Sequence, residues 1–361
     1  MPERSQLVLI TGGGTGGHVF PGLAAAAALT ARGVRVHWLG TRAGMESRLV
    51  PAAGIPLSFL RVSGVRGKSR WQQLLAPLLL VVAIAHALLV VLKLRPVCML
   101  GTGGFVAGPG GIAAWLMRVP VVVHEQNAVA GTTNRLLARF AARILLGLPG
   151  PFASHPRARL VGNPVRAAIA AIPAPATRLA GRAGPLRLLV IGGSQGARVL
   201  NETLPAALAL LPTGERPEVW HQGGARELDA CRERYRERGV EARTTAFIED
   251  MVAAYEWADV VVCRAGALTV SELAAAGLPA ILVPLPTAID DHQSVNARWL
   301  ADTGAALAIA QDAFTPGWLA AQLARWHGAR EELLLMAGRA RALAMPAAAE
   351  TVATNCLEVA R

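Results

Sequence analysis

Cysteine and aromatic residues are scarce in this chain of 361 residues. Its four cysteines show no Cys-x-x-Cys spacing, so neither a zinc site nor a disulfide framework is predicted, and reduced cytoplasmic thiols are the simplest interpretation. Aromatic residues make up 5% of the chain, and no stretch alternates them with basic residues, so nucleic acid is not an expected partner. We expect no signal peptide, because the first apolar run, residues 7–10, is short and ends in glycines.

Carboxylates are almost absent from the first half of the chain. Residues 1–163 contain 17 lysines and arginines against three aspartates and glutamates, a net charge of +14, whereas the remainder carries −2. A one-sided basic surface favours an anionic partner, such as an acidic ligand or an anionic lipid surface. An arginine-rich surface that is simply solvated would give the same count.

Long apolar runs are also rare, with one exception at residues 74–94, which is long enough to cross a bilayer. A spanning helix would place the glycine turns near Gly12 and Gly192 on opposite sides of the membrane and would divide a series of β-α units. We therefore expect a helix that is partly buried in its domain and whose exposed apolar part contacts the membrane surface. One helix face would carry apolar residues near several arginines: Trp71, Leu74, Leu75 and Leu78.

Glycine, in contrast, is plentiful and gathers in three turns, at residues 11–18, 101–111 and 192–198. Each turn follows a short apolar run and precedes a helix-like stretch. Backbone N–H groups in such turns can approach a phosphate without a Cβ in the way. Three of them in one chain indicate a phosphorylated substrate that carries a diphosphate.

Short apolar runs alternate with helical stretches in both halves of the chain, which predicts parallel sheets covered by helices on both faces. The Pro-, Ala- and Gly-rich run after Gly162 is the expected linker. We predict an α/β protein with two Rossmann-like, doubly wound domains that face each other across a cleft, residues 1–163 and 164–344, and a C-terminal helix in residues 345–361 that packs back on the first. The predicted strands are 7–11, 34–39, 96–100, 119–124, 143–146, 186–191, 218–222, 241–245, 260–263, 280–283 and 306–309. The predicted helices are 20–32, 46–53, 71–93, 110–118, 131–142, 200–211, 225–238, 251–254, 269–276, 296–303, 316–325 and 347–359.

The first glycine turn resembles a dinucleotide loop but has no acidic residue after the second strand, where residues 38–42 read Trp-Leu-Gly-Thr-Arg. A nicotinamide cofactor is therefore disfavoured, although Arg42 could meet a 2′-phosphate. His18 ends the turn near a helix N-terminus, which favours a neutral imidazole and so a general base. A histidine that only caps the helix by a hydrogen bond is the alternative.

Polar residues also follow later strands. His124 to Asn127 read His-Glu-Gln-Asn, and ligand binding by hydrogen bonds explains them better than a metal site does. After residues 260–263, the N–H groups of Ala267 to Val270 are expected to face phosphate oxygens. Glu272 could accept from ribose hydroxyls or complete a capping box with Thr269. Asp290 and Asp291 could hold Mg²⁺, but solvated caps are the commoner role of such a pair.

Eight motifs in order make the chain resemble the MurG family of bacterial lipid-intermediate glycosyltransferases. They are TGGGTGGHVFP, GTGGFVAGPGG, HEQNAVAGTTNR, GNPVR, GGSQGAR, FIEDM, CRAGALTVSEL and DDHQ. The resemblance implies a glycosyltransferase-B fold, with an acceptor- and membrane-binding first domain and a UDP-sugar-binding second domain. It implies inverting transfer of N-acetylglucosamine from UDP-N-acetylglucosamine to the 4-hydroxyl of the muramoyl sugar in undecaprenyl-diphospho-muramoyl-pentapeptide, a step of peptidoglycan synthesis. No metal or other cofactor is implied.

The same resemblance implies peripheral attachment to the cytoplasmic face of the inner membrane, an anionic membrane surface as a partner, and contacts with other cell-wall synthesis proteins. It places Ile248 against the uracil through its backbone, Glu272 on the ribose and Gln293 on the acetylated sugar. His18 is the first candidate for the base and Glu125 the second. The implied substrate-binding residues are Thr15, Gly16, Gly17, Asn127, Arg166, Ser194, Ile248, Ala267, Leu268, Thr269, Val270, Ser271, Glu272 and Gln293.

Four positions depart from the family pattern. Phe105 and Ala107 stand where the family usually has Tyr and Ser, and Leu285 and Thr287 replace an aromatic residue and a His. Two other classes of protein stay open on the residues alone. A UDP-sugar epimerase of the same fold would share the donor half, and a membrane-binding protein without activity would share the basic first half.

Overall fold

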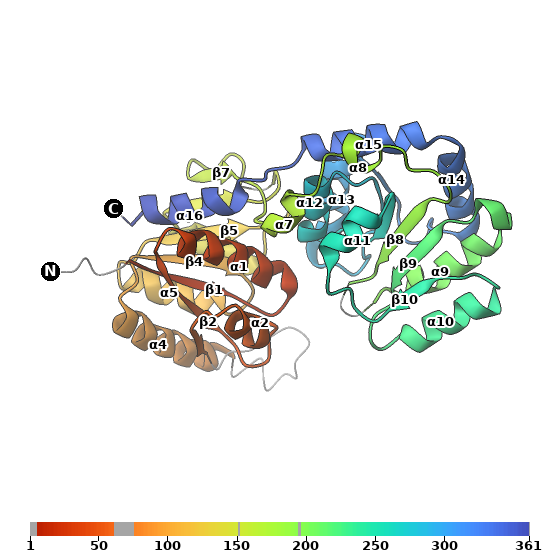
Figure 1. Ribbon diagram of the computed structural model, residues 1–361. Coiled ribbons are helices and arrows are strands. Elements are labelled where there is room, and N and C mark those ends of the chain that lie inside the picture. The colour runs from red at the N-terminus through yellow and green to blue at the C-terminus, as the bar shows by residue number, and fades with distance from the viewer. Residues whose placement is uncertain (1–5, 61–75, 151, 194–195, 361) are drawn as a thin grey trace. The chain divides into compact units, whose positions relative to one another are not determined.

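The computed structural model describes residues 6–60, 76–150, 152–193 and 196–360, and these form two compact units (Figure 1). The first unit comprises Met1–Arg166 and Met345–Arg361, and the second comprises Ala167–Ala344. The sequence placed the corresponding boundaries after residues 163 and 344. Each unit is built on one parallel sheet with helices on its faces, as the alternation of strands and helices predicted.

The sheet of the first unit has seven strands in the order β3-β2-β1-β4-β5-β6-β7, all parallel. Its strands are β1 (Leu7–Gly12), β2 (Arg35–Gly40), β3 (Leu57–Phe59), β4 (Cys98–Gly103), β5 (Val121–Glu125), β6 (Arg143–Leu146) and β7 (Ala158–Leu160). Its helices are α1 (Gly16–Ala31), α2 (Glu46–Ala52), α4 (Ala76–Leu94), α5 (Ala107–Leu116), α6 (Thr132–Ala138) and α16 (Ala348–Glu358). The central strand β1 is buried along its whole length, as expected for a strand covered on both faces.

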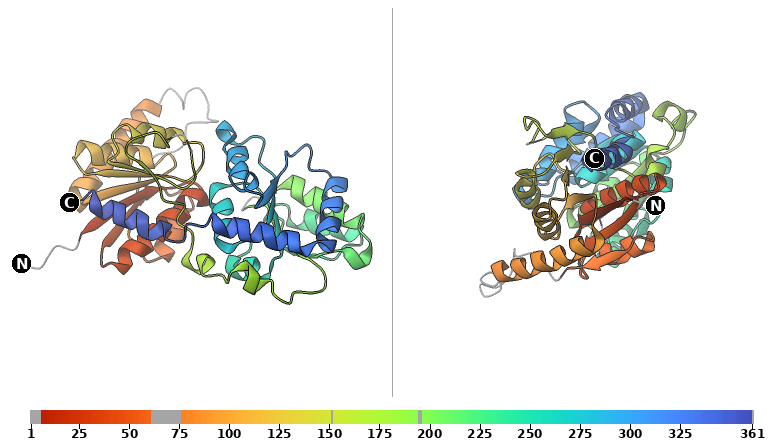
Figure 2. Two further views of the ribbon diagram at one scale, coloured as in Figure 1. Left: turned by 90° about the horizontal axis from the view of Figure 1, so that it is seen from above. Right: turned by 90° about the vertical axis from the view of Figure 1, so that its left-hand side faces the viewer.

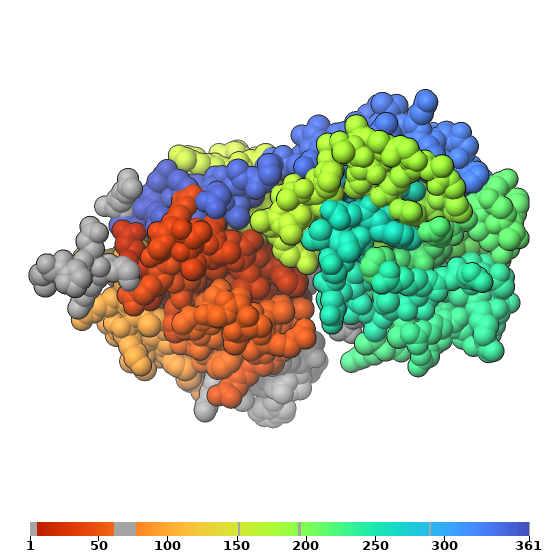
Figure 3. Space-filling view, viewed as in Figure 1, coloured from red at the N-terminus to blue at the C-terminus, as the bar shows by residue number. Residues whose placement is uncertain are grey.

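Alternate residues of β1 enter two separate hydrophobic clusters on opposite faces of this sheet. Val8 and Ile10 pack with α1 and α16, whereas Leu9 packs with α4, α5 and α6. Figure 1 shows α1 and α16 on one side of the strands and α4 on the other. The C-terminal segment thus completes the first unit, and in Figure 3 its blue surface lies against the red surface of α1.

The sheet of the second unit has six parallel strands in the order β10-β9-β8-β11-β12-β13. They are β8 (Arg187–Ile191), β9 (Glu218–Gln222), β10 (Arg243–Thr245), β11 (Val260–Cys263), β12 (Ala280–Leu282) and β13 (Ala306–Ala308). The helices and turns are α7 (Ala167–Ala170), α8 (Pro175–Arg178), α9 (Arg198–Ala209), η1 (Thr213–Glu215), α10 (Leu228–Glu237), α11 (Met251–Trp257), α12 (Ala267–Ala276), η2 (Ile289–Asp291), α13 (His292–Ala301), α14 (Pro316–Gly328) and α15 (Arg330–Ala342). The strand order reverses beside β8, where such sheets usually bind ligands.

Several helices begin earlier than their composition predicts. We expected helices from residues 20 and 110, but α1 begins at Gly16 and α5 at Ala107. Glycine disfavours a helix, yet here it allows the helix to approach its neighbours closely. A Cβ at Gly111 would lie 2.6 Å from Leu137 Cδ2, so tertiary packing outweighs the propensity.

Five further helices and strands were not expected. The expected linker contains the short helices α7 and α8, and the long helix α15 was missed. The edge strands β3 and β7 have three residues each, too short for a recognisable pattern.

Candidate functional site

The first glycine turn connects β1 to α1 in the first unit. Thr15 is the N-cap residue of α1 and is exposed, and its side chain makes no capping hydrogen bond. Gly16 and Gly17 open the helix, so their N–H groups belong to the first turn, which has no partner inside the helix. A helix start of this kind can bind an anion, and the role of these three residues in substrate binding stays a prediction.

Glu46 holds this turn in place, a role that the sequence did not reveal. Its carboxylate is fully buried and accepts from the N–H of Gly14 at 3.0 Å and from the N–H and hydroxyl of Thr41 at 2.9 and 2.7 Å. The sequence lacked an acidic residue directly after β2, and Glu46 follows that strand by six residues. Because backbone groups occupy its carboxylate, Glu46 positions the loop and is not presented to a ribose.

The second glycine turn, after β4, makes room for the ring of His18. Gly103 adopts a φ of 106°, and a Cβ there would lie 2.7 Å from His18 Nδ1. His18 Nδ1 lies 3.0 Å from the Thr102 carbonyl oxygen and 3.1 Å from Gln126 Oε1. The structure therefore brings together His18, the second glycine turn and the His-Glu-Gln-Asn segment after β5. This half-buried ring is fixed by Nδ1 and does not act as a helix cap.

The carboxylate of Glu125 organises the loop that follows β5. Oε1 accepts from the N–H and the side-chain amide of Asn127 at 3.0 and 3.3 Å. Oε2 accepts from the Gly131 N–H at 3.0 Å and from Asn134 Nδ2 at 2.8 Å. Glu125 is 1% exposed, so these four bonds occupy a carboxylate that solvent barely reaches. The geometry favours a positioning role for Glu125 and fixes the orientation of Asn127.

Arg166 lies in the first unit, beside α1. Its guanidinium carbon is 5.8 Å from the centre of the Phe20 ring, four residues after the start of the helix. Phe105, where the family usually has Tyr, approaches the first glycine turn: a Cβ at Gly14 would lie 3.8 Å from its Cε1. Ala107 is fully buried in α5. At position 105 the contact surface of an aromatic ring is therefore kept and its hydroxyl is lost.

In the second unit, α12 begins directly after β11 with Gly266 as its N-cap residue and no capping side chain. The expectation for Val270 is wrong, because its N–H donates to the Gly266 carbonyl at 3.0 Å and begins the helical ladder. Open N–H groups at this helix start are those of Ala267, Leu268 and Thr269. The proposed capping box is also wrong, since Thr269 lies inside the helix and not at its N-cap.

Two side chains of α12 have defined partners. Glu272 is buried and its Oε2 accepts from the Tyr255 hydroxyl at 3.0 Å. Tyr255, on α11, is a support of Glu272 that the sequence did not indicate. The Ser271 hydroxyl donates to the Ala267 carbonyl one turn earlier at 2.8 Å, so this bond lies within the helix.

A cavity of about 720 Å³ lies at the carboxyl ends of β8 and β11. Two of the expected donor residues, Thr269 and Gln293, line it, together with Leu285, one of the four departures. Gln293 Oε1 accepts from the N–H groups of Ala265 and Leu285 at 3.3 and 3.0 Å, which leaves its NH₂ as the group it can offer a ligand. The other lining residues are Ile191, Gly192, Gly193, Gly196, Ala197, Arg198, Val199, Glu202, Arg264, Gly266 and Gln311.

Arg264 and Gln311 are lining residues that the sequence did not single out. Arg264 donates to Gln311 Oε1 at 2.7 Å and to the carbonyls of Val283 and Pro284, and burial lowers the pKa of its guanidinium. Gln311 follows β13 in a region without a recognisable motif. The pair thus ties the loop after β13 to the loop after β12 at the edge of the cavity.

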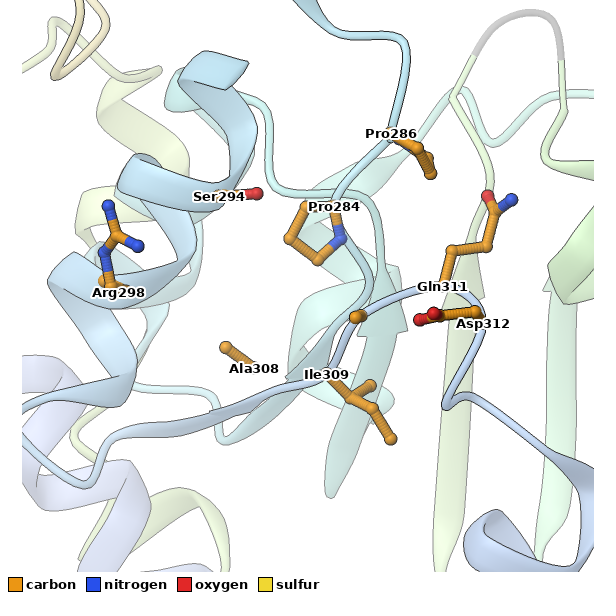
Figure 4. Close-up of a pocket in the computed structure, with 9 residues that line it drawn as sticks. Pro284, Pro286, Ser294, Arg298, Ala308, Ile309, Gln311 and Asp312 are labelled. Carbon is orange, nitrogen blue, oxygen red and sulfur yellow. The ribbon is translucent and has the colours of Figure 1, made fainter.

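A second cavity, of about 540 Å³, adjoins the same loops in the second unit. Figure 4 shows Arg298 and Ser294 on α13 and Gln311 and Asp312 after β13 around it. Gln311 lines both cavities, so they share a wall.

The remaining expected residues are less informative. Ile248 is 2% exposed, so its side chain is not offered to a ligand, and the contact of its backbone with the uracil stays a prediction. Ser194 lies outside the described residues. Asp290 and Asp291 take positive φ values, and Asp291 Oδ1 accepts from the Ser294 hydroxyl at 2.6 Å. Within the described residues no three His, Cys, Asp or Glu side chains are grouped as metal ligands would be.

The helix α4 is partly buried and presents a large apolar surface. Ala83, Ala87 and Val91, spaced by four residues, are buried against the sheet. In the right panel of Figure 2 the N-terminal end of α4 extends beyond the sheet of the first unit. Exposed apolar residues of α4 are Leu78, Leu79, Leu80, Val81, Val82, Leu89 and Leu92. Of the expected face, Leu78 is exposed, and Trp71, Leu74 and Leu75 lie outside the described residues.

By length and composition alone, Pro77–Leu94 could cross a membrane. It is the one such helix in the described parts of the chain, and 17% of this stretch is buried.

Comparison with known proteins gives a consistent result over the whole chain. Residues 8–146 match the glycosyltransferase family 28 N-terminal domain, and residues 187–352 match the C-terminal domain of the same family. A Marinobacter nauticus protein is 53% identical over 359 residues, which cover 99% of this chain and 98% of that protein. It is named UDP-N-acetylglucosamine–N-acetylmuramyl-(pentapeptide) pyrophosphoryl-undecaprenol N-acetylglucosamine transferase.

Solved structures agree. The crystal structure of Acinetobacter baumannii MurG is similar with a TM-score of 0.82 and 39% identity, covering 98% of this chain and 99% of that one. A UDP-GlcNAc 2-epimerase from Neisseria meningitidis shares the fold, with a TM-score of 0.67 over 98% of this chain and 99% of that one, but is only 12% identical. The predicted glycosyltransferase-B fold and the resemblance drawn from the motifs are both confirmed. The chain therefore belongs to glycosyltransferase family 28, within the MurG family of N-acetylglucosamine transferases.

Proposed function

We propose that the chain transfers N-acetylglucosamine from UDP-N-acetylglucosamine to the 4-hydroxyl of the muramoyl sugar in undecaprenyl-diphospho-muramoyl-pentapeptide, and so converts lipid I to lipid II in peptidoglycan synthesis. The full-length match at 53% identity to a transferase of this name carries the proposal. The cavity at the carboxyl ends of β8 and β11, with the open start of α12 beside it, supports donor binding in the second unit.

The chemistry is a single displacement with inversion. His18 Nε2 accepts the proton of the 4-hydroxyl as that oxygen forms a bond to the anomeric carbon. The bond from this carbon to the diphosphate oxygen breaks, and UDP leaves with the electron pair. Arg166 and the N-terminus of α12 are the groups assigned to its negative charge. The proton on His18 then passes to solvent and restores the neutral ring.

His18 is preferred to Glu125 as the base for a geometric reason. Protein donors already occupy both oxygens of Glu125. His18, in contrast, is fixed through Nδ1, and within the described residues no group hydrogen bonds its Nε2. A ring held by one nitrogen with the other open is suited to proton transfer.

The charge of the first unit supports an anionic, lipid-linked acceptor. Of its three acidic residues before position 164, Glu46 and Glu125 are buried and accept from backbone N–H groups, so they do not neutralise surface arginines. The net positive charge of this half of the chain suits the acceptor diphosphate and anionic lipid.

The exposed apolar residues of α4 form an apolar surface in the first unit, and Trp115, Leu116 and Met117 are exposed at the end of the neighbouring α5. Such a surface near basic residues is typical of peripheral membrane binding. We assign the chain to the cytoplasmic face of the inner membrane, where it would lie on the bilayer through this surface.

The direct test is transfer of labelled sugar from UDP-N-acetylglucosamine to a short-chain lipid I analogue. We expect a labelled disaccharide on the lipid and release of UDP in equal amounts. Conversion of the nucleotide sugar to an epimer without the lipid acceptor would favour the epimerase alternative. Failure to bind UDP at all would contradict both enzymatic functions.

A further inference from the structure

We propose that Gln126 and His124 are positioning residues that fix His18 in the tautomer with its proton on Nδ1, so that Nε2 is left unprotonated as the base. The inference rests on the proposed function for the role of His18, but the tautomer itself can be measured without any reaction. It is carried by a continuous chain of hydrogen bonds in the first unit that ends on backbone carbonyls.

The chain of hydrogen bonds begins at the carbonyl of Gly162. His124 Nε2 lies 3.0 Å from this oxygen, and a carbonyl can only accept, so Nε2 carries the proton. Burial lowers the pKa of His124 below its ordinary value, which favours the neutral ring. In a neutral ring protonated at Nε2, Nδ1 is an acceptor. The hydrogen bond from His124 to Gly162 therefore makes His124 Nδ1 the acceptor of the next hydrogen bond.

The amide of Gln126 has only one orientation that satisfies its neighbours. Its Nε2 lies 2.9 Å from His124 Nδ1 and 3.0 Å from the His124 carbonyl oxygen, both of them acceptors. The NH₂ group must therefore face His124, which turns Oε1 towards His18 Nδ1 at 3.1 Å. Asn163 Nδ2 donates to the Gln126 carbonyl at 3.1 Å and holds the backbone of this residue.

Two acceptors therefore converge on one nitrogen of His18. Gln126 Oε1 and the Thr102 carbonyl oxygen both lie within 3.1 Å of Nδ1, so Nδ1 must donate. His124 and Gln126 are each 1% exposed, so water cannot readily replace these bonds. Free imidazole side chains favour the opposite tautomer, with the proton on Nε2. In that tautomer Nε2 could not accept the proton of the 4-hydroxyl. The hydrogen bonds to Nδ1 disfavour this unproductive tautomer.

The kinetic test uses Gln126→Met, which keeps side-chain length and removes the three side-chain hydrogen bonds of Gln126. We expect kcat to fall about tenfold, less than the full contribution of a general base, because the Thr102 carbonyl remains. The KM for UDP-N-acetylglucosamine should stay unchanged, since the expected donor cavity lies in the other unit. In a His18→Ala background the same change should cause no further loss.

The matched control is Asn355→Ala. Asn355 is a buried amide of the same unit, on α16, whose Nδ2 donates to the Thr351 carbonyl at 2.8 Å. It should lower the melting temperature without changing kcat. An equal loss of kcat from Gln126→Met with and without His18 would overturn the positioning role.

The spectroscopic test needs no variant of Gln126 to fold. Long-range proton–nitrogen spectra of the ¹⁵N-histidine-labelled chain, with His18 assigned from a His18→Asn sample, report which ring nitrogen is protonated. We expect Nδ1–H for His18 and Nε2–H for His124. Nε2–H at His18 would overturn the proposal. If the tautomers are as expected but the chain does not transfer sugar, the proposed function fails while the hydrogen-bond chain stands.

Discussion

The two units differ in where their carboxylates lie and in which groups they contact. In the first unit, Glu46 and Glu125 are buried and accept from loop N–H groups. In the second unit most acidic side chains lie on the surface, and several of them pair with arginines. Such pairs are Arg198–Glu202, Arg232–Asp229, Arg234–Glu202, Arg236–Glu233 and Arg325–Glu332. The first unit therefore carries a large net positive charge, whereas the charges of the second largely cancel.

The C-terminal segment is an exception to this contrast, because its two glutamates are exposed and pair with arginines of the first unit. Glu350 and Glu358 on α16 pair with Arg32 and Arg143 of the first unit at 2.6 and 3.4 Å. These two ion pairs of the first unit thus use residues from the far end of the chain. We interpret the segment as an attachment that joins α16 to α1 and β6 through these two ion pairs.

The largest expected effect tests the chemistry assigned to the first unit. His18→Ala should lower kcat at least ~100-fold, because general-base catalysis is typically worth about 10²–10⁴-fold, with little change in donor affinity. Steady-state kinetics with a lipid I analogue measures both quantities. Unchanged turnover would remove His18 from the role of base.

The next effect tests donor binding in the second unit. Glu272→Ala should weaken UDP binding by about 10- to 100-fold, because a hydrogen bond to a charged group contributes ~1.5–3 kcal/mol. Tyr255→Phe, which removes the supporting hydroxyl and leaves the carboxylate, should have a smaller effect. Titration calorimetry compares the two, and equal losses would indicate that Glu272 is structural.

A smaller effect concerns the apolar surface of α4. Val81→Glu places a charge where the side chain is 61% exposed, so folding should be unaffected while binding to anionic liposomes falls about tenfold. Leu210→Glu, at a residue of the second unit that is 62% exposed, is the matched control and should bind as the wild type does. Co-sedimentation at low and high salt measures the difference. Equal loss in both variants would contradict membrane contact through α4.

The smallest effect concerns the Arg32–Glu350 ion pair, which joins α16 to α1. Arg32→Ala should lower the free energy of unfolding by at most ~1 kcal/mol, because the Arg32–Glu350 pair is partly exposed to solvent. Chemical denaturation measures this change. A loss of several kcal/mol would show that α16 depends on this pair more than on the packing of Val352 and Cys356.

Much of the fold followed from sequence periodicity and glycine placement. Buried strands such as β1 and β11 are continuous apolar runs that end in glycine or polar residues, so both their positions and the edge that carries the site were predictable. Helix starts were not, since Gly16 and Gly17 begin α1 against their propensity.

The supports of the site were hidden for a different reason. Glu46 and Tyr255 act through contacts with residues 32 and 17 positions away, and no local pattern encodes such a contact. Gln126 was visible as part of a polar segment, but its role depends on the carbonyls of Thr102 and Gly162, which only the folded chain brings together. Motifs thus indicated which residues matter, and the structure showed what they hold.

We assign the general base to the first unit and the donor cavity to the second. Titration calorimetry of UDP against His18→Ala and Glu272→Ala tests this assignment. We expect the His18 variant to bind UDP as tightly as the wild type and the Glu272 variant to bind at least about tenfold more weakly. Weakened binding in the first variant with normal binding in the second would contradict it.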